Sequence, residues 1–118
     1  MKNSRQYGTK RSKYHNQKVY VDGIRFDSKK EARRYIQLKE LESAGEIHGL
    51  ELQPEYEILP SYKKNGKTIR RTVYRADFRY FQGDKVVVED VKGVETDIFR
   101  LKRKLVEYFY PDVTITLL

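Results

Sequence analysis

Two aspartates and a lysine stand where the sequence predicts the ends of two neighbouring strands. Asp90 and Lys92 come directly after three valines in VVVEDVKG, and Asp77 lies in YRADF on the strand before. Side chains on a strand alternate between its two faces. Asp90 and Lys92 therefore share one face with the first and third of these valines, while Glu89 points to the other face. These residues are the first candidates for chemistry.

The loop between the two strands decides which acids meet. A two- or four-residue loop centred on Gly83-Asp84 places Asp77 directly opposite Asp90. A three-residue loop would instead set Asp77 against Glu89 and leave Lys92 on the opposite face. Two-residue loops that contain glycine are the commoner hairpin connection, which favours the first register.

Two carboxylates about 5 Å apart repel each other in a direct cross-strand pair, and in a partly buried pair one is expected to stay protonated. Mg²⁺ reverses this repulsion, because it takes one or two carboxylates and keeps several waters. Lys92 is then close enough to orient a water or neutralise a phosphate. Two acids, a lysine and space for a metal ion are what hydrolysis of a phosphodiester bond needs. The alternative is structural: Asp90 and Lys92 form an exposed ion pair, and Asp77 pairs with Arg75 or Arg79.

The first half of the chain predicts a hairpin followed by a helix. KVYVDGIRF (18–26) alternates around Asp22-Gly23, a strong signal for a two-residue turn. Ser28, with Glu31 three residues later, has the pattern of a capping box that starts a helix. Gly45 is placed to end this helix as a left-handed cap. The apolar stripe of the helix, at helical spacing, consists of Ala32, Tyr35, Ile36, Leu38 and Leu41.

The second half predicts strands and a second helix. Strands are expected over 50–60, at an edge or bent because of Pro54, over 72–81, over 85–92 and over 113–118, with a turn at Asn65-Gly66 inside a basic loop. The second helix is expected to be capped by Thr96 or Asp97 and to end before Pro111. Its expected apolar face consists of Ile98, Leu101, Leu105, Val106 and Phe109. This order predicts an α/β or α+β fold, with one helix for each face of a small mixed sheet.

Composition limits the classes of function. The 118 residues suffice for one domain, expected over 18–118, preceded by a flexible basic arm over 1–17. The net charge of +8 favours a polyanionic partner, usually nucleic acid. There is no cysteine, which excludes disulfides and cysteine-bound zinc. No apolar stretch reaches about 18 residues, and no secretory signal is recognisable. We therefore expect a cytoplasmic protein that does not associate with a membrane.

These residues together resemble the PD-(D/E)XK nuclease superfamily. The likeness lies in Asp77, followed by Asp90-Val91-Lys92 on the next strand, between an N-terminal and a second helix, and it covers residues 28–118. The chain is also similar to small phage or prophage proteins related to Holliday-junction resolvases. That closer likeness is carried by KYHN (13–16), FDSKKEA (26–32), LELQP (50–54), YRADF (74–78) and VVVEDVKG (86–93). Ala76 stands where the superfamily motif has a proline. The resemblance implies a restriction-endonuclease-like core of helix, three strands, helix and strand (αβββαβ).

The resemblance also implies roles for individual residues. Asp77 and Asp90, with the Val91 carbonyl, would ligate Mg²⁺ or Mn²⁺, and Lys92 would be the catalytic lysine. Glu31 would complete the metal site or serve a second ion, although in its capping box it is equally well explained as the partner of Ser28. Two further residues are assigned: Gln53 could face the same cleft or be a polar edge-strand residue, and Glu89 is expected to be structural.

The basic segments supply candidate contacts to DNA. In the arm these are Lys13, Tyr14 and His15, and in the basic loop Lys63, Lys64, Lys67, Arg70 and Arg71. Each is, on its own, as readily a solvated charge or a bystander. Lys102, Arg103 and Lys104 on the second helix rank below the loop.

The expected function is that of a metal-dependent endonuclease that hydrolyses phosphodiester bonds of DNA, including branched or structured DNA, in phage DNA processing or recombination. A homodimer, and contact with other phage DNA-processing proteins in the host cytoplasm, are further expectations from the resemblance. The alternatives are a non-catalytic nucleic-acid-binding module with a nuclease-like fold, and an adaptor that recruits another nuclease.

Overall fold

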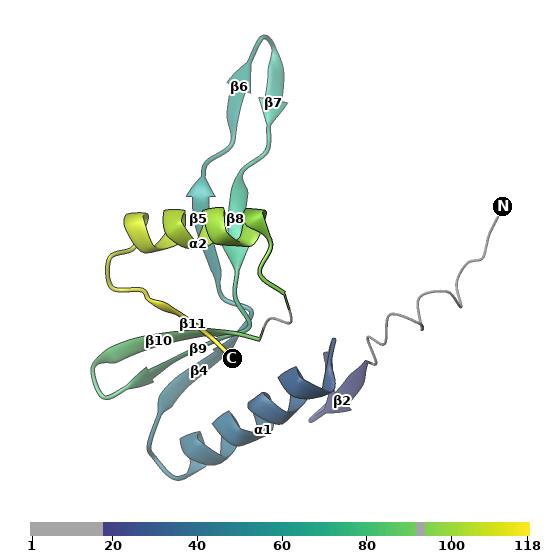
Figure 1. The fold of residues 1–118 in the computed structure, drawn as a ribbon, viewed down its shortest axis with the longest axis vertical. Helices are drawn as coiled ribbons and strands as arrows, with labels where there is room; N and C mark the ends of the chain where they lie inside the picture. Colours follow the sequence, from purple (N-terminus) through teal and green to yellow (C-terminus); the bar gives the residue numbers. More distant parts are fainter. Residues whose placement is uncertain (1–17, 92–93) are drawn as a thin grey trace, which may run out of the picture. The chain divides into compact units, whose positions relative to one another are not determined.

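A computed structural model of the protein describes residues 18–91 and 94–118 (Figure 1). Over these residues the fold is a mixture of α and β, with two helices and a four-stranded mixed sheet. The chain divides into two compact units, residues 1–40 and residues 41–118. The division expected from the sequence, an arm over 1–17 and one domain over 18–118, stays a prediction, and residues 1–17 lie outside the described part. No helix of the described ranges combines the length and the apolar character that crossing a membrane requires.

The first unit begins with the predicted hairpin. Strands β2 (Val19–Val21) and β3 (Ile24–Phe26) pair antiparallel across a two-residue turn. Asp22 and Gly23 in that turn have φ angles of 54° and 76°. Positive φ at both central residues is what a type I′ turn requires, and Asp-Gly tolerates it. The hairpin predicted from the sequence is therefore confirmed.

Helix α1 (Lys29–Ser43) follows the hairpin and begins as predicted. The Glu31 N–H donates a hydrogen bond to Ser28 Oγ at 3.1 Å, so Ser28 is the N-cap. The Tyr35 hydroxyl donates to Asp22 Oδ2 at 2.9 Å and ties the helix to the hairpin turn. Of the predicted stripe, Ala32, Tyr35 and Leu38 are buried and Leu41 is half-buried, whereas Ile36 is 43% exposed.

A left-handed glycine ends α1. Gly45 has a φ of 77°, and the Glu46 N–H donates to the Leu41 carbonyl at 2.9 Å. This bond satisfies a carbonyl that the helix end would otherwise leave without a partner. The predicted cap is confirmed.

The second unit is built on the four-stranded sheet, whose strand order is β11-β10-β9-β4. Its strands are β4 (His48–Leu52), β9 (Phe78–Gln82), β10 (Lys85–Asp90) and β11 (Ile115–Leu117). β4, β9 and β10 run antiparallel, and β11 lies parallel to β10. The sheet is thus mixed, and β4 lies at its edge, as predicted.

Two of the predicted strands are each broken in two. The segment 50–60 forms β4 and β5 (Glu55–Leu59), and the segment 72–81 forms β8 (Thr72–Arg75) and β9. β5 pairs only with β8, in a two-stranded ladder outside the four-stranded sheet. The predicted basic loop between them is a hairpin as well, formed by β6 (Tyr62–Lys64) and β7 (Lys67–Ile69).

The break is a bend in a continuous ribbon. Between the two ladders the Gln53 N–H donates to the Asp77 carbonyl at 2.9 Å, and the Ala76 N–H donates to the Pro54 carbonyl at 3.1 Å. The register is the same on both sides of these bonds. Gln53 has a φ of 52°, a left-handed conformation that is uncommon outside glycine, and Pro54 has no N–H to donate. Gln53 and Pro54 therefore turn the ribbon out of the sheet, and Asp77 lies at the corner.

Helix α2 (Asp97–Phe109) packs against β5 and β8. Thr96 is its N-cap, because Thr96 Oγ1 accepts a hydrogen bond from the Phe99 N–H at 3.0 Å. The core of this unit contains Phe99 and Val106 from the helix. Their partners from the strands and the last loop are Tyr56, Tyr74, Ala76, Val88, Val113 and Ile115.

The predicted apolar face of α2 is largely wrong. Of its members only Val106 is fully buried, while Ile98 is 62% and Leu101 51% exposed. Lys102 and Arg103 lie half-buried beside Phe99 and Val106, and their charged groups donate to the carbonyls of Val73 and Ile115, each at 3.1 Å. Long cationic side chains can cover apolar surface with their stems, so the side of the helix that faces the core does not look apolar in the sequence.

Candidate metal centre

The hairpin of β9 and β10 has the register favoured by the sequence. Gln82 pairs with Lys85 across the two-residue turn Gly83-Asp84, and the ladder runs up to the pair Phe78 and Glu89. The three-residue loop is therefore wrong. The ladder ends at this pair: the next residue, Asp77, donates its N–H to the Glu89 carbonyl, and no ladder pair of the described residues joins it to Asp90.

Asp77 is fixed at the corner of the ribbon by three hydrogen bonds. Its carbonyl accepts from Gln53, and its N–H donates to the Glu89 carbonyl at 3.1 Å. Its carboxylate oxygen Oδ2 accepts from the Val91 N–H at 2.7 Å. The side chain is thus held against the main chain of the residue that follows Asp90, and it is only partly buried.

Asp90 is the last residue of β10 and is only 2% exposed. It shares the face of Val88, which belongs to the core beneath α2. The buried hydroxyl of Tyr74, on β8, donates a hydrogen bond to Asp90 Oδ2. A buried carboxylate needs such a donor, because water no longer solvates its charge.

Both aspartates act on the Tyr74 hydroxyl. The pKa of Tyr74 is raised above its ordinary value, first by burial, then by the hydrogen bond to Asp90 and the negative charge of Asp90, and further by the charge of Asp77. A phenolate at this point would lie beside two carboxylates. Asp77, Asp90 and Tyr74 therefore form one constellation, drawn from the corner of the ribbon, β10 and β8.

Glu89 lies on the other face of β10, as predicted. It is also 2% exposed, and its carboxylate accepts a hydrogen bond from the Tyr80 hydroxyl at 2.5 Å. Tyr80 is on β9, on the face that Glu89 shares. Neighbouring acids in the sequence are thus buried on opposite faces of one strand, each with a tyrosine donor.

The arginines considered as partners of Asp77 have ion pairs with glutamates. Arg75 contacts Glu55, and Arg79 contacts Glu51 while its guanidinium lies 5.4 Å from the centre of the Tyr56 ring. These contacts therefore do not support the structural alternative, in which Arg75 or Arg79 neutralises Asp77.

The other predicted site residues are placed as follows. Gln53 is exposed, and its main chain is bonded to Asp77. Val91 contributes its N–H to the Asp77 carboxylate, and the proposed role of its carbonyl stays a prediction. Glu31 lies in the first unit, on the first turn of α1, and its part in the metal site stays a prediction. Lys92 lies outside the described residues.

The donor set fits a hard divalent cation. Carboxylate oxygens are what Mg²⁺ and Mn²⁺ prefer, and Mg²⁺ is usually bound through one or two carboxylates with waters completing its shell. One oxygen of each aspartate is oriented by a protein donor, as metal-binding carboxylates commonly are. Across residues 18–91 and 94–118, no group of three or more His, Cys, Asp or Glu side chains could hold a metal ion. A site on these residues would use the pair alone.

Tyr74 is the residue of this constellation that the sequence analysis missed. It stands in YRADF, three residues before Asp77, where the alternation of the sequence predicts only a strand. A signal was present, because a tyrosine on the core face of a strand must find a partner for its hydroxyl. The acid that it meets is 16 residues away.

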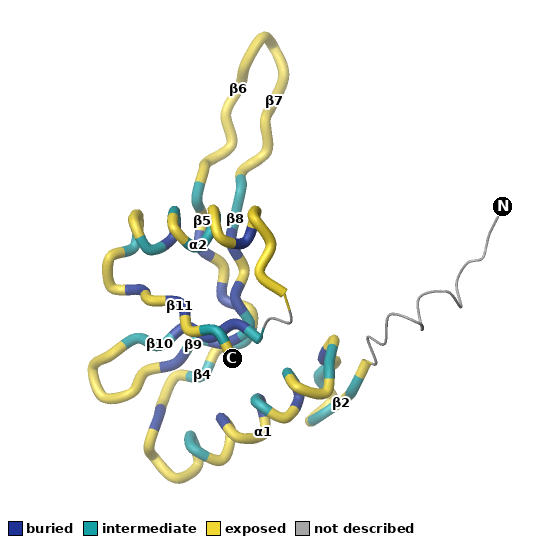
Figure 2. The backbone as a smooth tube through the Cα atoms, viewed as in Figure 1, coloured by how far each residue is buried: buried dark blue, intermediate teal, exposed yellow. Residues whose placement is uncertain are grey.

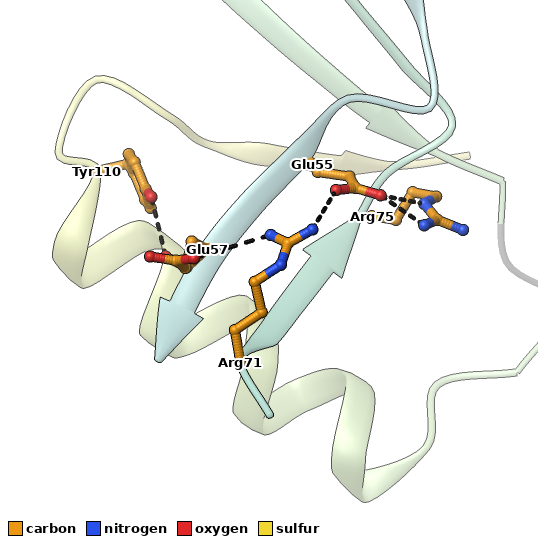
Figure 3. Close-up of polar contacts among 5 residues, drawn as sticks. All are labelled: Glu55, Glu57, Arg71, Arg75 and Tyr110. Carbon is orange, nitrogen blue, oxygen red and sulfur yellow. Dashed lines mark hydrogen bonds and ion pairs between the residues drawn. The ribbon is translucent and has the colours of Figure 1, made fainter. Parts of the chain in front are cut away.

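The predicted DNA contacts fall into three groups. Lys13, Tyr14 and His15 lie outside the described residues. Lys63, Lys64, Lys67 and Arg70 are exposed on or beside the β6–β7 hairpin. Arg71 instead forms ion pairs with Glu55 and Glu57, at 3.4 and 3.8 Å, between β5 and β8 (Figure 3).

Comparison with protein families matches residues 11–118 to the family described as "Protein of unknown function (DUF1064)". No curated protein and no solved structure matches the chain.

Proposed function

We propose that this chain, which belongs to the DUF1064 family, is a metal-dependent endonuclease that hydrolyses phosphodiester bonds of DNA. The proposal includes Mg²⁺ or Mn²⁺ as the cofactor and the PD-(D/E)XK resemblance of residues 28–118. Branched or structured DNA, as met in phage DNA processing or recombination, is the substrate that the resemblance favours.

One observation carries the proposal: the Asp90 carboxylate accepts the hydrogen bond of the Tyr74 hydroxyl, and Asp77 lies close enough for its charge to act on the same hydroxyl. Two acids that approach each other in a partly buried site destabilise the fold unless a cation joins them. A bound metal ion would remove this loss of stability, which explains why the two acids are present.

The residues of the chain would divide the work as follows. Asp77 and Asp90 would hold the ion, and the Val91 N–H and the Tyr74 hydroxyl would orient the carboxylates. When bound, the ion would polarise the phosphate and lower the pKa of the attacking water. Lys92 would stabilise the negative charge that develops on the phosphate.

The order of elements supports the resemblance. Along the chain come α1, β4, β9, β10, α2 and β11, with the β5–β8 ribbon as an excursion between β4 and β9. This agrees with the helix, three strands, helix and strand of a restriction-endonuclease-like core. Under the proposal, Asp77 and Asp90 are the two acids of the motif.

A second candidate is a nucleic-acid-binding module that keeps this fold without catalysis. The net charge of +8 supports nucleic-acid binding in either case. That candidate is favoured by the small donor set, since among the described residues only a pair of carboxylates is assembled at the corner.

Cleavage assays separate the candidates. The protein is incubated with branched and with linear DNA, in Mg²⁺, in Mn²⁺ and in chelator, beside Asp90→Ala and Lys92→Ala. We expect cleavage by the wild type that chelator abolishes and that both substitutions nearly eliminate, with DNA binding largely kept. Asp84→Ala, which removes an exposed acid from the turn of the same hairpin, is the matched control and should cleave like the wild type.

Other outcomes contradict the proposal in different ways. Binding without cleavage under every metal condition would favour the module. A complete lack of affinity for DNA would favour an adaptor. Cleavage that survives both chelator and Asp90→Ala would place the chemistry elsewhere.

A further inference from the structure

We infer that the β6–β7 hairpin is a docking element that enters the major groove of duplex DNA and contacts phosphates on both sides of it through Lys63, Lys64 and Lys67. The inference deepens the proposed function, on which it rests for the choice of DNA, but it requires neither metal nor cleavage.

The hairpin is built to be exposed. Every residue from 59 to 71 is exposed, and Figure 2 shows the hairpin in the exposed colour along its whole length. It continues the β5–β8 ribbon and extends beyond α2 (Figure 1). Asn65 and Gly66 close it with φ angles of 53° and 76°, the left-handed pair of a tight two-residue turn. Such an element adds no core, so its sequence is free to serve a partner.

The charges of the hairpin have one sign. The segment YKKNGKTI (62–69) contains three lysines and no acid. Lys64 and Lys67 are directly opposite each other beside the turn, an arrangement that costs stability because like charges repel. Over the described ranges, no hydrogen bond or ion pair involves the side chain of any of the three lysines. A polyanion would relieve this repulsion.

The root of the ribbon is neutralised, in contrast to its tip. Arg71 pairs with Glu55 and Glu57, and Arg75 pairs with Glu55 (Figure 3). The pKa of Glu55 is lowered, first by its hydrogen bond from Arg75 and then by the charge of that arginine, with a smaller effect of Arg71. The Tyr110 hydroxyl also donates to the Glu57 carbonyl at 2.9 Å and ties the ribbon to the end of α2. The charge that remains without a partner is thus concentrated at the far end of an anchored ribbon.

The dimensions fit the major groove of B-form DNA. Strands in a hairpin are about 4.8 Å apart, and the groove is about 12 Å wide and admits a two-stranded ribbon. From Tyr62 to Asn65 in the turn the hairpin extends about 10 Å at roughly 3.3 Å per residue, more than the groove depth of about 8.5 Å. Lysines on both strands can then reach phosphates on both walls.

Other nucleic acids fit less well. A-form RNA has a deep, narrow major groove that side chains do not enter. Single strands are usually bound by several aromatic side chains on which successive bases stack, and Tyr62 is the one aromatic residue of the segment 62–69. Duplex DNA is therefore the partner that the hairpin favours.

The test is the binding of duplex DNA in chelator, where metal-dependent cleavage does not occur. The triple variant Lys63→Gln, Lys64→Gln, Lys67→Gln is compared with the control Lys29→Gln, Lys85→Gln, Lys104→Gln. The control lysines are exposed and lie on α1, β10 and α2. Both variants lower the formal net charge by three, from +8 to +5, so they differ only in where the charge is removed.

We expect a loss of affinity specific to the hairpin variant. Each phosphate contact contributes about 0.9 to the slope of log K against log salt concentration, so three contacts predict a slope smaller by about 2.7. At 0.1 M salt this corresponds to a loss of up to about 500-fold. Melting temperatures of both variants should stay at or near that of the wild type, because the substituted residues are exposed.

Two results would overturn the inference, and a third would separate it from the proposed function. Equal affinities and salt slopes for the two variants would show a general charge effect. Tighter binding of single-stranded DNA or duplex RNA, lost in the hairpin variant, would assign the hairpin a different partner. Loss of duplex binding in the hairpin variant, together with no cleavage in any metal, would leave the docking element standing and reject the endonuclease.

Discussion

Replacing Asp90 by asparagine should stabilise the metal-free protein. The substitution removes one of the two carboxylate charges that act on the Tyr74 hydroxyl and keeps the shape of the side chain. The new amide oxygen can still accept the hydrogen bond of Tyr74, which the carboxylate accepts in the wild type. A stabilising substitution at a buried polar position is unusual, because most such changes destabilise.

The magnitude follows from the separation expected of side chains that meet across neighbouring strands, about 5 Å. Two unit charges at that distance repel by about 3 kcal/mol at an effective dielectric constant near 20. Turning the acceptor of the Tyr74 hydrogen bond from charged to neutral costs about 1 kcal/mol. The net gain is about 2 kcal/mol in the free energy of unfolding, or about 8 °C in melting temperature for a domain of this size.

The assay is thermal and urea unfolding at neutral pH in chelator, with Glu89→Gln as the matched control. Glu89 is as deeply buried as Asp90 and also accepts from a tyrosine, but it lies on the opposite face of β10. It therefore has no opposed aspartate, and its neutralisation should give no gain. The reasoning is refuted if Asp90→Asn is no more stable than the wild type, or if Glu89→Gln gains as much.

Two further predictions concern Tyr74 and α2. Because the pKa of Tyr74 is raised in the folded state, its contribution is complete below about pH 10, the ordinary tyrosine value, and is lost as the pH rises above it. In urea unfolding, the free energy of unfolding of the wild type should therefore fall by about 1.4 kcal/mol per pH unit above pH 10 relative to that of Tyr74→Phe. Parallel pH dependences of the two free energies would contradict this. Leu101→Asp should change the free energy of unfolding by less than about 1 kcal/mol because Leu101 is 51% exposed. Val106→Asp should prevent folding because Val106 is fully buried. Circular dichroism measures both effects, and a Leu101→Asp variant that is less folded than Val106→Asp would contradict the prediction.

Features with short-range causes could be predicted from the sequence. The turns at Asp22-Gly23 and Gly83-Asp84 follow from dipeptides that tolerate positive φ. The caps at Ser28 and Thr96 follow from hydroxyls that satisfy N–H groups of the first helical turn. The register of β9 and β10, which runs up to Phe78 and Glu89, depends on the second of these turns, so the strand ends that precede Asp77 and Asp90 could be predicted from the sequence.

Features with distant causes could not be predicted. The segment 72–81 alternates without interruption, and its break at Asp77 is imposed by Gln53 and Pro54 on the partner strand. The core face of α2 contains Lys102 and Arg103, whose charges find carbonyls on other elements. In each case the deciding contact joins residues far apart in the sequence, which no local pattern reports.

The pairing of Asp77 with Asp90 in a metal site is tested most directly by Mn²⁺ binding, measured by calorimetry or by electron paramagnetic resonance without DNA. The wild type, Glu89→Gln and Asp84→Asn should bind Mn²⁺ with similar affinity. Asp77→Asn and Asp90→Asn should each weaken binding at least about ten-fold, the size of effect expected when a metal site loses one of its groups. Two results would contradict a metal site at the corner of the ribbon. One is Mn²⁺ binding by both aspartate variants that is as tight as that of the wild type, and the other is a wild type that does not bind Mn²⁺.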